Sequence, residues 1–77
     1  MSKASNTMTE TMVHCWEFYL PDGEEVTYYT YTSDSQMARD QVTADECSND
    51  WELDSHFTLP EKDVLEWYGK EMILDAE

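Results

Sequence analysis

Two runs in which at least half of the positions are hydrophobic flank a turn signal in the first half of the chain. Residues 12–20 (MVHCWEFYL) and 25–32 (EVTYYTYT) are rich in β-branched and aromatic side chains, and Pro-Asp-Gly at 21–23 separates them. These three residue types suit successive positions of a three-residue hairpin loop, with glycine at the left-handed position. The pattern therefore predicts a β-hairpin in which Leu20 opposes Glu24.

That register assigns the hairpin side chains to two faces. Counting back from the loop pairs Phe18 with Val26 and Trp16 with Tyr28, because directly opposed residues of antiparallel strands share a face. The face expected to form the core carries Trp16, Phe18, Leu20, Val26 and Tyr28. The reverse face carries Cys15, Glu17, Tyr19, Thr27, Tyr29 and Tyr31. The reverse face is more aromatic than an ordinary wet surface, so we expect it to contact something.

A helix and a third strand follow the hairpin. Ser33 and Gln36 have the spacing of a capping box, which predicts a helix from there to about Cys47. Residues 51–59 (WELDSHFTL) then alternate between apolar and polar side chains. This period of two is typical of a strand with one dry face and one acidic face.

A second helix is predicted at the end of the chain. Thr58-Leu59-Pro60-Glu61 has the features of a capped helix start with proline in the first turn, and apolar residues recur at helical spacing as far as Ile73. We therefore expect a helix over residues 60–74, in which Gly69 lowers stability by about 1 kcal/mol relative to alanine.

The predicted order is strand, strand, helix, strand, helix. This order indicates an α+β fold with a three-stranded antiparallel sheet packed against two helices. Residues 12–77 would form one small domain, and the polar residues 1–11 a flexible N-terminal arm. No stretch approaches the ~20 apolar residues of a transmembrane helix, and no signal peptide is recognisable. We therefore expect a soluble, cytoplasmic protein with reduced cysteines.

Acidic residues are spread along the chain and outnumber basic ones. Eighteen Asp and Glu against four Lys and Arg give a net charge of -14 in 77 residues. Solubility of a small domain needs a magnitude of only about 2 to 8. Acids interleaved with aromatic residues indicate a folded body with a negative surface, and hence a positively charged partner.

The acids fall into three clusters on the predicted elements, and two tyrosines of the reverse hairpin face complete the predicted binding surface. Alternate residues of the last strand would project in a row about 6.8 Å apart. The other two clusters lie at the hairpin tip and on the first turns of the last helix. The predicted partner-binding residues are Asp50, Glu52 and Asp54 on the strand, Asp22, Glu24 and Glu25 at the tip, Glu61, Asp63 and Glu66 on the helix, and Tyr29 and Tyr31.

No residue pattern specifies a reaction or a metal site. His14 and Cys15 are adjacent on a strand, so they point to opposite faces and cannot converge on one zinc ion. The acidic segments do not fit the spacing of a calcium-binding loop, and a 77-residue chain can hardly enclose a cleft between two catalytic carboxylates. Direct nucleic-acid binding is disfavoured because this surface would repel phosphates. We expect a non-enzymatic protein without metal or cofactor.

In size, acidity and lack of a catalytic motif, the chain resembles the phage-encoded DNA-mimic inhibitors. This functional class includes anti-restriction proteins, anti-CRISPR proteins and uracil-DNA glycosylase inhibitors. The resemblance implies that carboxylates replace phosphates, and tyrosines replace sugars or bases, in the basic groove of a host defence complex such as a CRISPR effector or a restriction enzyme.

Two alternatives remain open. The order strand, strand, helix, strand is similar to that of a small phage inhibitor of bacterial RNA polymerase, which implies an acidic face that binds a basic patch on polymerase. The other alternative is an acidic interaction subunit that forms a homodimer through its tyrosine face.

Overall fold

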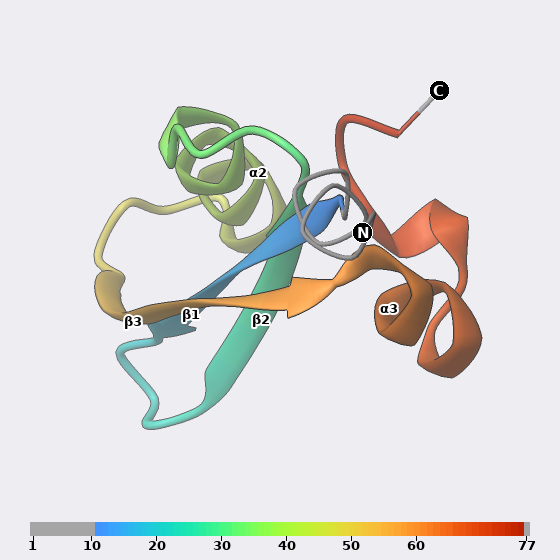
Figure 1. The fold of residues 1–77 in the computed structure, drawn as a ribbon. Helices are drawn as coiled ribbons and strands as arrows, with labels where there is room; N and C mark the ends of the chain where they lie inside the picture. The colour runs from blue at the N-terminus through green and yellow to red at the C-terminus, as the bar shows by residue number, and fades with distance from the viewer. Residues whose placement is uncertain (1–10, 77) are drawn as a thin grey trace, which may run out of the picture.

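A computed structural model describes residues 11–76 of the chain as a three-stranded antiparallel sheet with two α-helices (Figure 1). The α+β class and the predicted order of strands and helices are confirmed. The predicted N-terminal arm lies outside the described residues, except for Thr11. No helix in this part of the chain is long and apolar enough to cross a membrane. The elements are β1 (Met12–Tyr19), β2 (Glu25–Thr30), α2 (Gln36–Glu46), β3 (Glu52–Pro60), α3 (Glu61–Trp67) and a short 3-10 helix, η1 (Lys70–Met72), and the strand order is β2-β1-β3.

The hairpin of β1 and β2 has the predicted register. Trp16 opposes Tyr28 and Phe18 opposes Val26. The backbone N–H of Leu20 donates to the carbonyl oxygen of Glu24 at 2.8 Å, which closes the loop. Gly23 has a φ of 91°, a conformation that side chains with a Cβ rarely adopt, so glycine is required at this turn position.

The sheet is covered on opposite faces at opposite ends (Figure 1). Helix α2 covers one face near the hairpin loop, and α3 with the C-terminal segment covers the other face near the start of β1. The α2-side cluster is formed by Trp16, Phe18, Leu20, Ala38 and Val42, with Val26, Tyr28, Trp51 and Leu53 at its margin. The α3-side cluster is formed by Val13, Cys15, Tyr29, Val64 and Ile73, with Tyr31, Leu59 and Ala76 at its margin. Because β1 is the central strand, it contributes buried side chains to both clusters.

Strand β3 contains a β-bulge that the sequence pattern did not predict. Glu17 of β1 opposes Ser55, whereas its neighbour Phe18 opposes Leu53, so Asp54 is an extra residue. One extra residue moves the following side chains to the other face. Leu53 accordingly packs in the α2-side cluster and Leu59 in the α3-side cluster. The prediction of one continuous dry face over residues 51–59 is therefore wrong.

Helix α2 begins later than the predicted capping box. The Asp34 carboxylate accepts the backbone N–H of Gln36 at 2.9 Å, and Asp34 in turn donates its N–H to the Thr32 hydroxyl. These two side-chain turns carry the chain past Ser33 before the helix starts, and the N-cap residue is Ser35, which makes no side-chain capping bond. The predicted capping box is therefore wrong, although the helix ends next to Cys47, as expected.

The predicted terminal helix stops after Trp67. Gly69 has a φ of 96°, and its N–H donates to the carbonyl oxygen of Val64 at 3.2 Å, so this glycine ends α3 instead of lying inside it. The predicted cap at Thr58 is also wrong, because Thr58 lies inside β3 and the N–H of Glu61 donates to the carbonyl oxygen of Thr11.

Beyond Gly69 the chain returns along the outer edge of β2. Ile73 forms a parallel bridge with Tyr29, and the N–H of Leu74 donates to the carbonyl oxygen of Tyr29 at 2.8 Å. The Asp75 carboxylate accepts the N–H groups of Tyr31 at 2.7 Å and Thr32 at 3.0 Å. The C-terminal segment therefore closes this edge of the sheet.

Candidate binding surface

Acids from β2 and β3 lie on either side of one exposed tyrosine at the hairpin end of the sheet. Tyr19 of β1 opposes Glu25 on one neighbouring strand and Glu52 on the other. Because neighbouring strands are about 4.8 Å apart, the two acids flank Tyr19 across roughly 10 Å. The Tyr19 side chain is 49% exposed. One acid of the predicted hairpin-tip cluster and one of the predicted strand cluster therefore meet here.

Two further carboxylates, Asp54 and Glu17, extend this group. A side-chain hydrogen bond with Asp54 raises the pKa of Glu25, and loss of solvent and repulsion by Asp54 and Glu17 act in the same direction. Glu17 also accepts the hydroxyl of Ser55 at 2.6 Å. A raised carboxyl pKa is the result expected when like charges crowd together without a compensating base. We call the half-buried Glu17 together with the exposed Tyr19, Glu25, Glu52 and Asp54 the acidic face.

Asp50 and Asp22 line a shallow groove on the α2 side of the sheet, not on the acidic face. Asp50 precedes β3, and Asp54 is the bulge residue, so the two do not form the regular row with Glu52 that the sequence predicted. The groove holds about 220 Å³ and joins the hairpin loop to the end of α2. Its lining residues are Leu20, Pro21, Asp22, Glu46, Ser48, Asp50 and Trp51. Glu24, at the hairpin tip, is exposed.

The third predicted cluster lies at the other end of β3. Glu61 directly follows that strand, whereas Glu52 begins it, and nine residues of strand extend about 30 Å. The Glu61 carboxylate accepts the hydroxyl of Tyr31 at 2.6 Å, and this hydrogen bond raises the pKa of Tyr31 to about 12. Asp63 is half-buried and Glu66 is exposed on α3. These acids are therefore separate from the acidic face.

Of the two predicted contact tyrosines, Tyr29 is buried and Tyr31 is half-buried. Tyr29 is only 8% exposed, and burial raises its pKa to about 12. Its ring lies against that of Tyr68, with centroids 5.3 Å apart. The expectation of a tyrosine face is therefore wrong, because the chain turns back at Gly69 and covers it. The exposed aromatic residues are instead Tyr19, Phe57, Trp67 and Tyr68, of which Trp67 is 59% exposed.

The histidines meet on the face opposite the acidic face. Nδ1 of His14 and Nε2 of His56 are 2.9 Å apart, and the His56 ring lies parallel to that of Trp16 with centroids 4.1 Å apart. One histidine must be neutral in order to accept this hydrogen bond. Cys15 points to the other face, where it is buried, and Cys47 lies at the end of α2. Residues 11–76 contain no group of three or more side chains placed to hold a metal ion.

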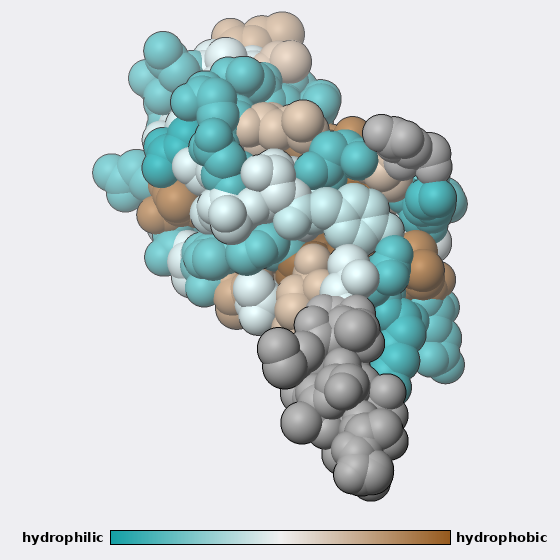
Figure 2. Space-filling view, turned by 45° about the horizontal axis from the view of Figure 1, so that its top comes forward, coloured by the Kyte–Doolittle hydropathy of each residue, from teal (hydrophilic) through white to brown (hydrophobic). Residues whose placement is uncertain are grey.

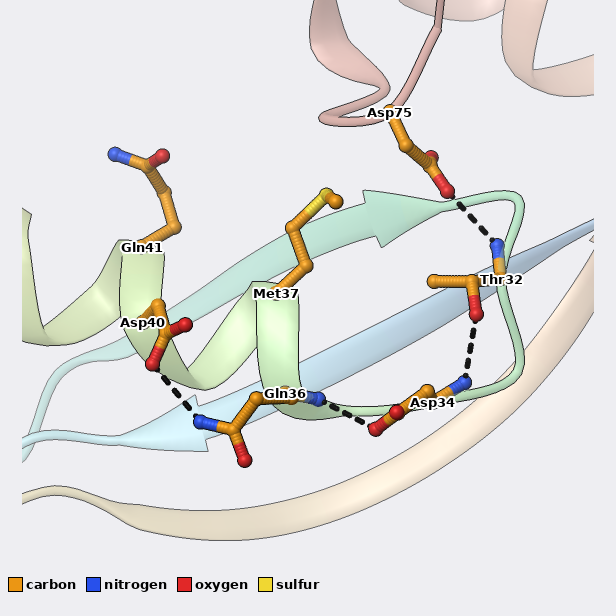
Figure 3. A pocket seen from close by; sticks show the side chains of 7 residues that line it. All are labelled: Thr32, Asp34, Gln36, Met37, Asp40, Gln41 and Asp75. Atoms are coloured by element: carbon orange, nitrogen blue, oxygen red, sulfur yellow. Dashed lines mark hydrogen bonds between the residues drawn. The ribbon is translucent and has the colours of Figure 1, made fainter.

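A larger groove of about 510 Å³ separates the start of α2 from the C-terminal segment (Figure 3). Its carboxylates already accept hydrogen bonds within the fold. Asp34 accepts the backbone N–H of Gln36, Asp40 accepts the side-chain amide of Gln36, and Asp75 accepts the N–H of Thr32. Asp75 therefore ties the C-terminal segment to the end of β2, and Asp34 and Asp40 bond within the start of α2.

The side of the molecule seen in Figure 2 is largely hydrophilic. Figure 2 shows one side of the molecule, where apolar side chains form small, separate patches between hydrophilic ones. No protein-family model, curated protein or solved structure matches the chain. The acidic face is therefore interpreted from its own geometry and charge.

Proposed function

We propose that the protein is a non-enzymatic inhibitor that mimics DNA and occupies the basic nucleic-acid-binding groove of a host defence complex, such as a CRISPR effector or a restriction enzyme. The observation that carries this proposal is the acidic face, where four carboxylates surround one exposed tyrosine. None of the three strands contains Lys or Arg, so no neighbouring base in the sheet neutralises these acids.

The dimensions of the acidic face support the proposal. Glu25 and Glu52 lie on either side of β1, roughly 10 Å apart across the sheet. The grooves of B-DNA, across which phosphates face each other, are about 6 to 12 Å wide. Basic side chains that bridge such a groove could reach both carboxylates, and an arginine could also stack on the ring of Tyr19. Binding would exclude DNA by competition and would weaken as salt screens the charges.

Charge reversal on the acidic face tests the proposal. The variant E52K/D54K and the control E66K/E71K change the net charge by the same amount, but the control residues lie on α3 and η1. Each variant and the wild type would capture proteins from a nuclease-treated bacterial lysate at low salt. We expect E52K/D54K to lose at least tenfold in affinity, because it replaces attraction by repulsion, and the control to lose less than threefold.

Duplex DNA then separates mimicry from other binding modes. We expect excess duplex DNA to release the captured proteins. Capture that is indifferent to duplex DNA contradicts mimicry, and recovery of RNA polymerase subunits under those conditions favours the transcription-inhibitor alternative. Equal losses in the two variants would show that only net charge matters. The homodimer alternative rests on an exposed tyrosine face, and burial of Tyr29 with partial burial of Tyr31 leaves Tyr19 as the exposed tyrosine of that face.

A further inference from the structure

The two edges of the sheet differ in whether their backbone groups are paired. The edge formed by β2 is closed by Ile73, Leu74 and Asp75. Strand β3 forms the other edge, and within residues 11–76 no further strand pairs with it. An open strand edge is a template for the backbone of another chain.

The hairpin register identifies which residues of β3 present their backbone to this open edge. The N–H of Leu20 donates to Glu24, so Leu20 directs its backbone groups toward β2. By alternation the odd-numbered residues of β1 bond to β3, where Cys15 opposes Phe57. The intervening residues His56 and Thr58 therefore direct their N–H and C=O groups outward.

Side chains along the same edge indicate the chemistry of a docking strand. On the side of the acidic face, the edge carries Asp54, Ser55 and Phe57, and Phe57 is 41% exposed. A strand that pairs with β3 places alternate side chains on this side. A basic side chain opposite Ser55 would approach Asp54 and Glu17, and an apolar one two residues away would cover Phe57.

We propose that β3 binds an extended basic segment of the target protein by strand addition. The backbone of that segment pairs with His56 and Thr58, and its side chains alternate between basic residues over the acidic face and an apolar residue against Phe57. The positive charge of the segment rests on the proposed function. A second copy of this chain is disfavoured as the occupant, because it would bring another net charge of -14.

Proline at Thr58 tests the backbone contact directly. T58P removes an outward N–H and no bond of the internal ladder, a change that edge strands tolerate. The control T58V keeps this N–H and removes only the hydroxyl. The probe is a ten-residue peptide in which arginine and valine take turns at every second position and threonine fills the positions between, so that arginine and valine lie on the same side of the strand. Its binding to the full chain is measured by calorimetry at low salt. We expect T58P to lower affinity at least tenfold and T58V less than twofold.

Amide hydrogen exchange on the wild type gives a readout that does not depend on whether T58P folds. The amides of His56 and Thr58 should exchange rapidly in the free protein and at least tenfold more slowly with the peptide, whereas those of Phe57 and Leu59 should be slow throughout. A peptide whose backbone is N-methylated at alternate positions should not bind.

Three results would overturn the proposal. They are failure of the peptide to bind, binding without protection of His56 and Thr58, and protection that rises with protein concentration alone, which would assign the edge to a second copy. These results are separate from the DNA competition. If DNA releases the captured proteins but the peptide does not protect the amides of His56 and Thr58, strand addition alone is refuted. If the peptide protects these amides but DNA does not release the captured proteins, mimicry alone is refuted.

Discussion

The hydroxyl oxygen of Thr30 accepts the hydrogen bond of the most deeply buried tryptophan, Trp16. Trp16 is 4% exposed, and its indole N–H donates to the Thr30 hydroxyl at 2.8 Å. Thr30 is fully buried and donates to the carbonyl oxygen of Thr32 at 2.8 Å. Thr30→Val keeps the shape of the side chain but leaves the indole N–H without an acceptor.

The expected cost of this substitution is about 2 to 3 kcal/mol. An unsatisfied buried donor costs about 1 to 3 kcal/mol, and the Thr32 carbonyl loses a partner as well. The total stability of a domain of this size is about 3 to 5 kcal/mol. The Thr30→Val variant should therefore retain only a small part of its stability.

A second tryptophan–threonine pair supplies the control. The indole N–H of Trp51 donates to the Thr43 hydroxyl at 3.0 Å, but both residues are half-buried. Water can replace the lost acceptor there, so Thr43→Val should cost less than about 1 kcal/mol. Urea unfolding followed by tryptophan fluorescence measures both variants. A cost at Thr30 no larger than that at Thr43 would refute the reasoning.

Two further predictions concern the C-terminal segment and the buried thiol. Asp75→Ala removes two charge-assisted hydrogen bonds to the amides of Tyr31 and Thr32. It should lower the free energy of unfolding, measured in urea, by about 2 to 3 kcal/mol, and Asp75→Asn should recover part of the loss. An unchanged urea midpoint in Asp75→Ala would contradict this role. Burial, reinforced by the charge of Glu17, raises the pKa of Cys15 from 9.0 to about 11, so its contribution to stability should be complete below pH 9 and lost as the pH rises through about 11. Urea melts across this range should show a shallower alkaline decline in Cys15→Ala than in the wild type, and parallel curves would count against the burial argument.

The hairpin could be predicted from the sequence because its determinants are local. Pro21, Asp22 and Gly23 define the loop, and the loop defines the register of every pair behind it. The structure reproduces the pairs of Trp16 and Phe18 predicted in this way.

The second half of the chain was less predictable because tertiary contacts override its local pattern. The alternation over residues 51–59 is genuine, but pairing with β1 inserts the bulge at Asp54, and no glycine or proline marks that position. Glycine often ends a helix, but the helical spacing of Met72 and Ile73 beyond Gly69 suggested that the helix continues through it. Ile73 instead pairs with Tyr29.

The acidic character of the candidate site could be predicted from the sequence, but the arrangement of its residues could not. The charge indicated an acidic surface, and Glu25, Glu52 and Asp54 were among the residues expected there. Their meeting around Tyr19 depends on β3 pairing with β1, which the sequence pattern did not show. Glu17 was missed as a site residue for the same reason.

The bulge at Asp54 also determines how the two hydrophobic clusters are linked in folding. The half of β3 before it supplies Leu53 to one cluster, and the half after it supplies Leu59 to the other. The two clusters therefore share β3 as well as β1. In a regular strand Leu53 and Leu59 would share a face, because their separation is even, so the extra residue is what directs them to opposite clusters. A substitution at residue 54 keeps this arrangement, and deletion of Asp54 would leave a regular ladder in which Phe18 still opposes Leu53 and Glu17 still opposes Ser55.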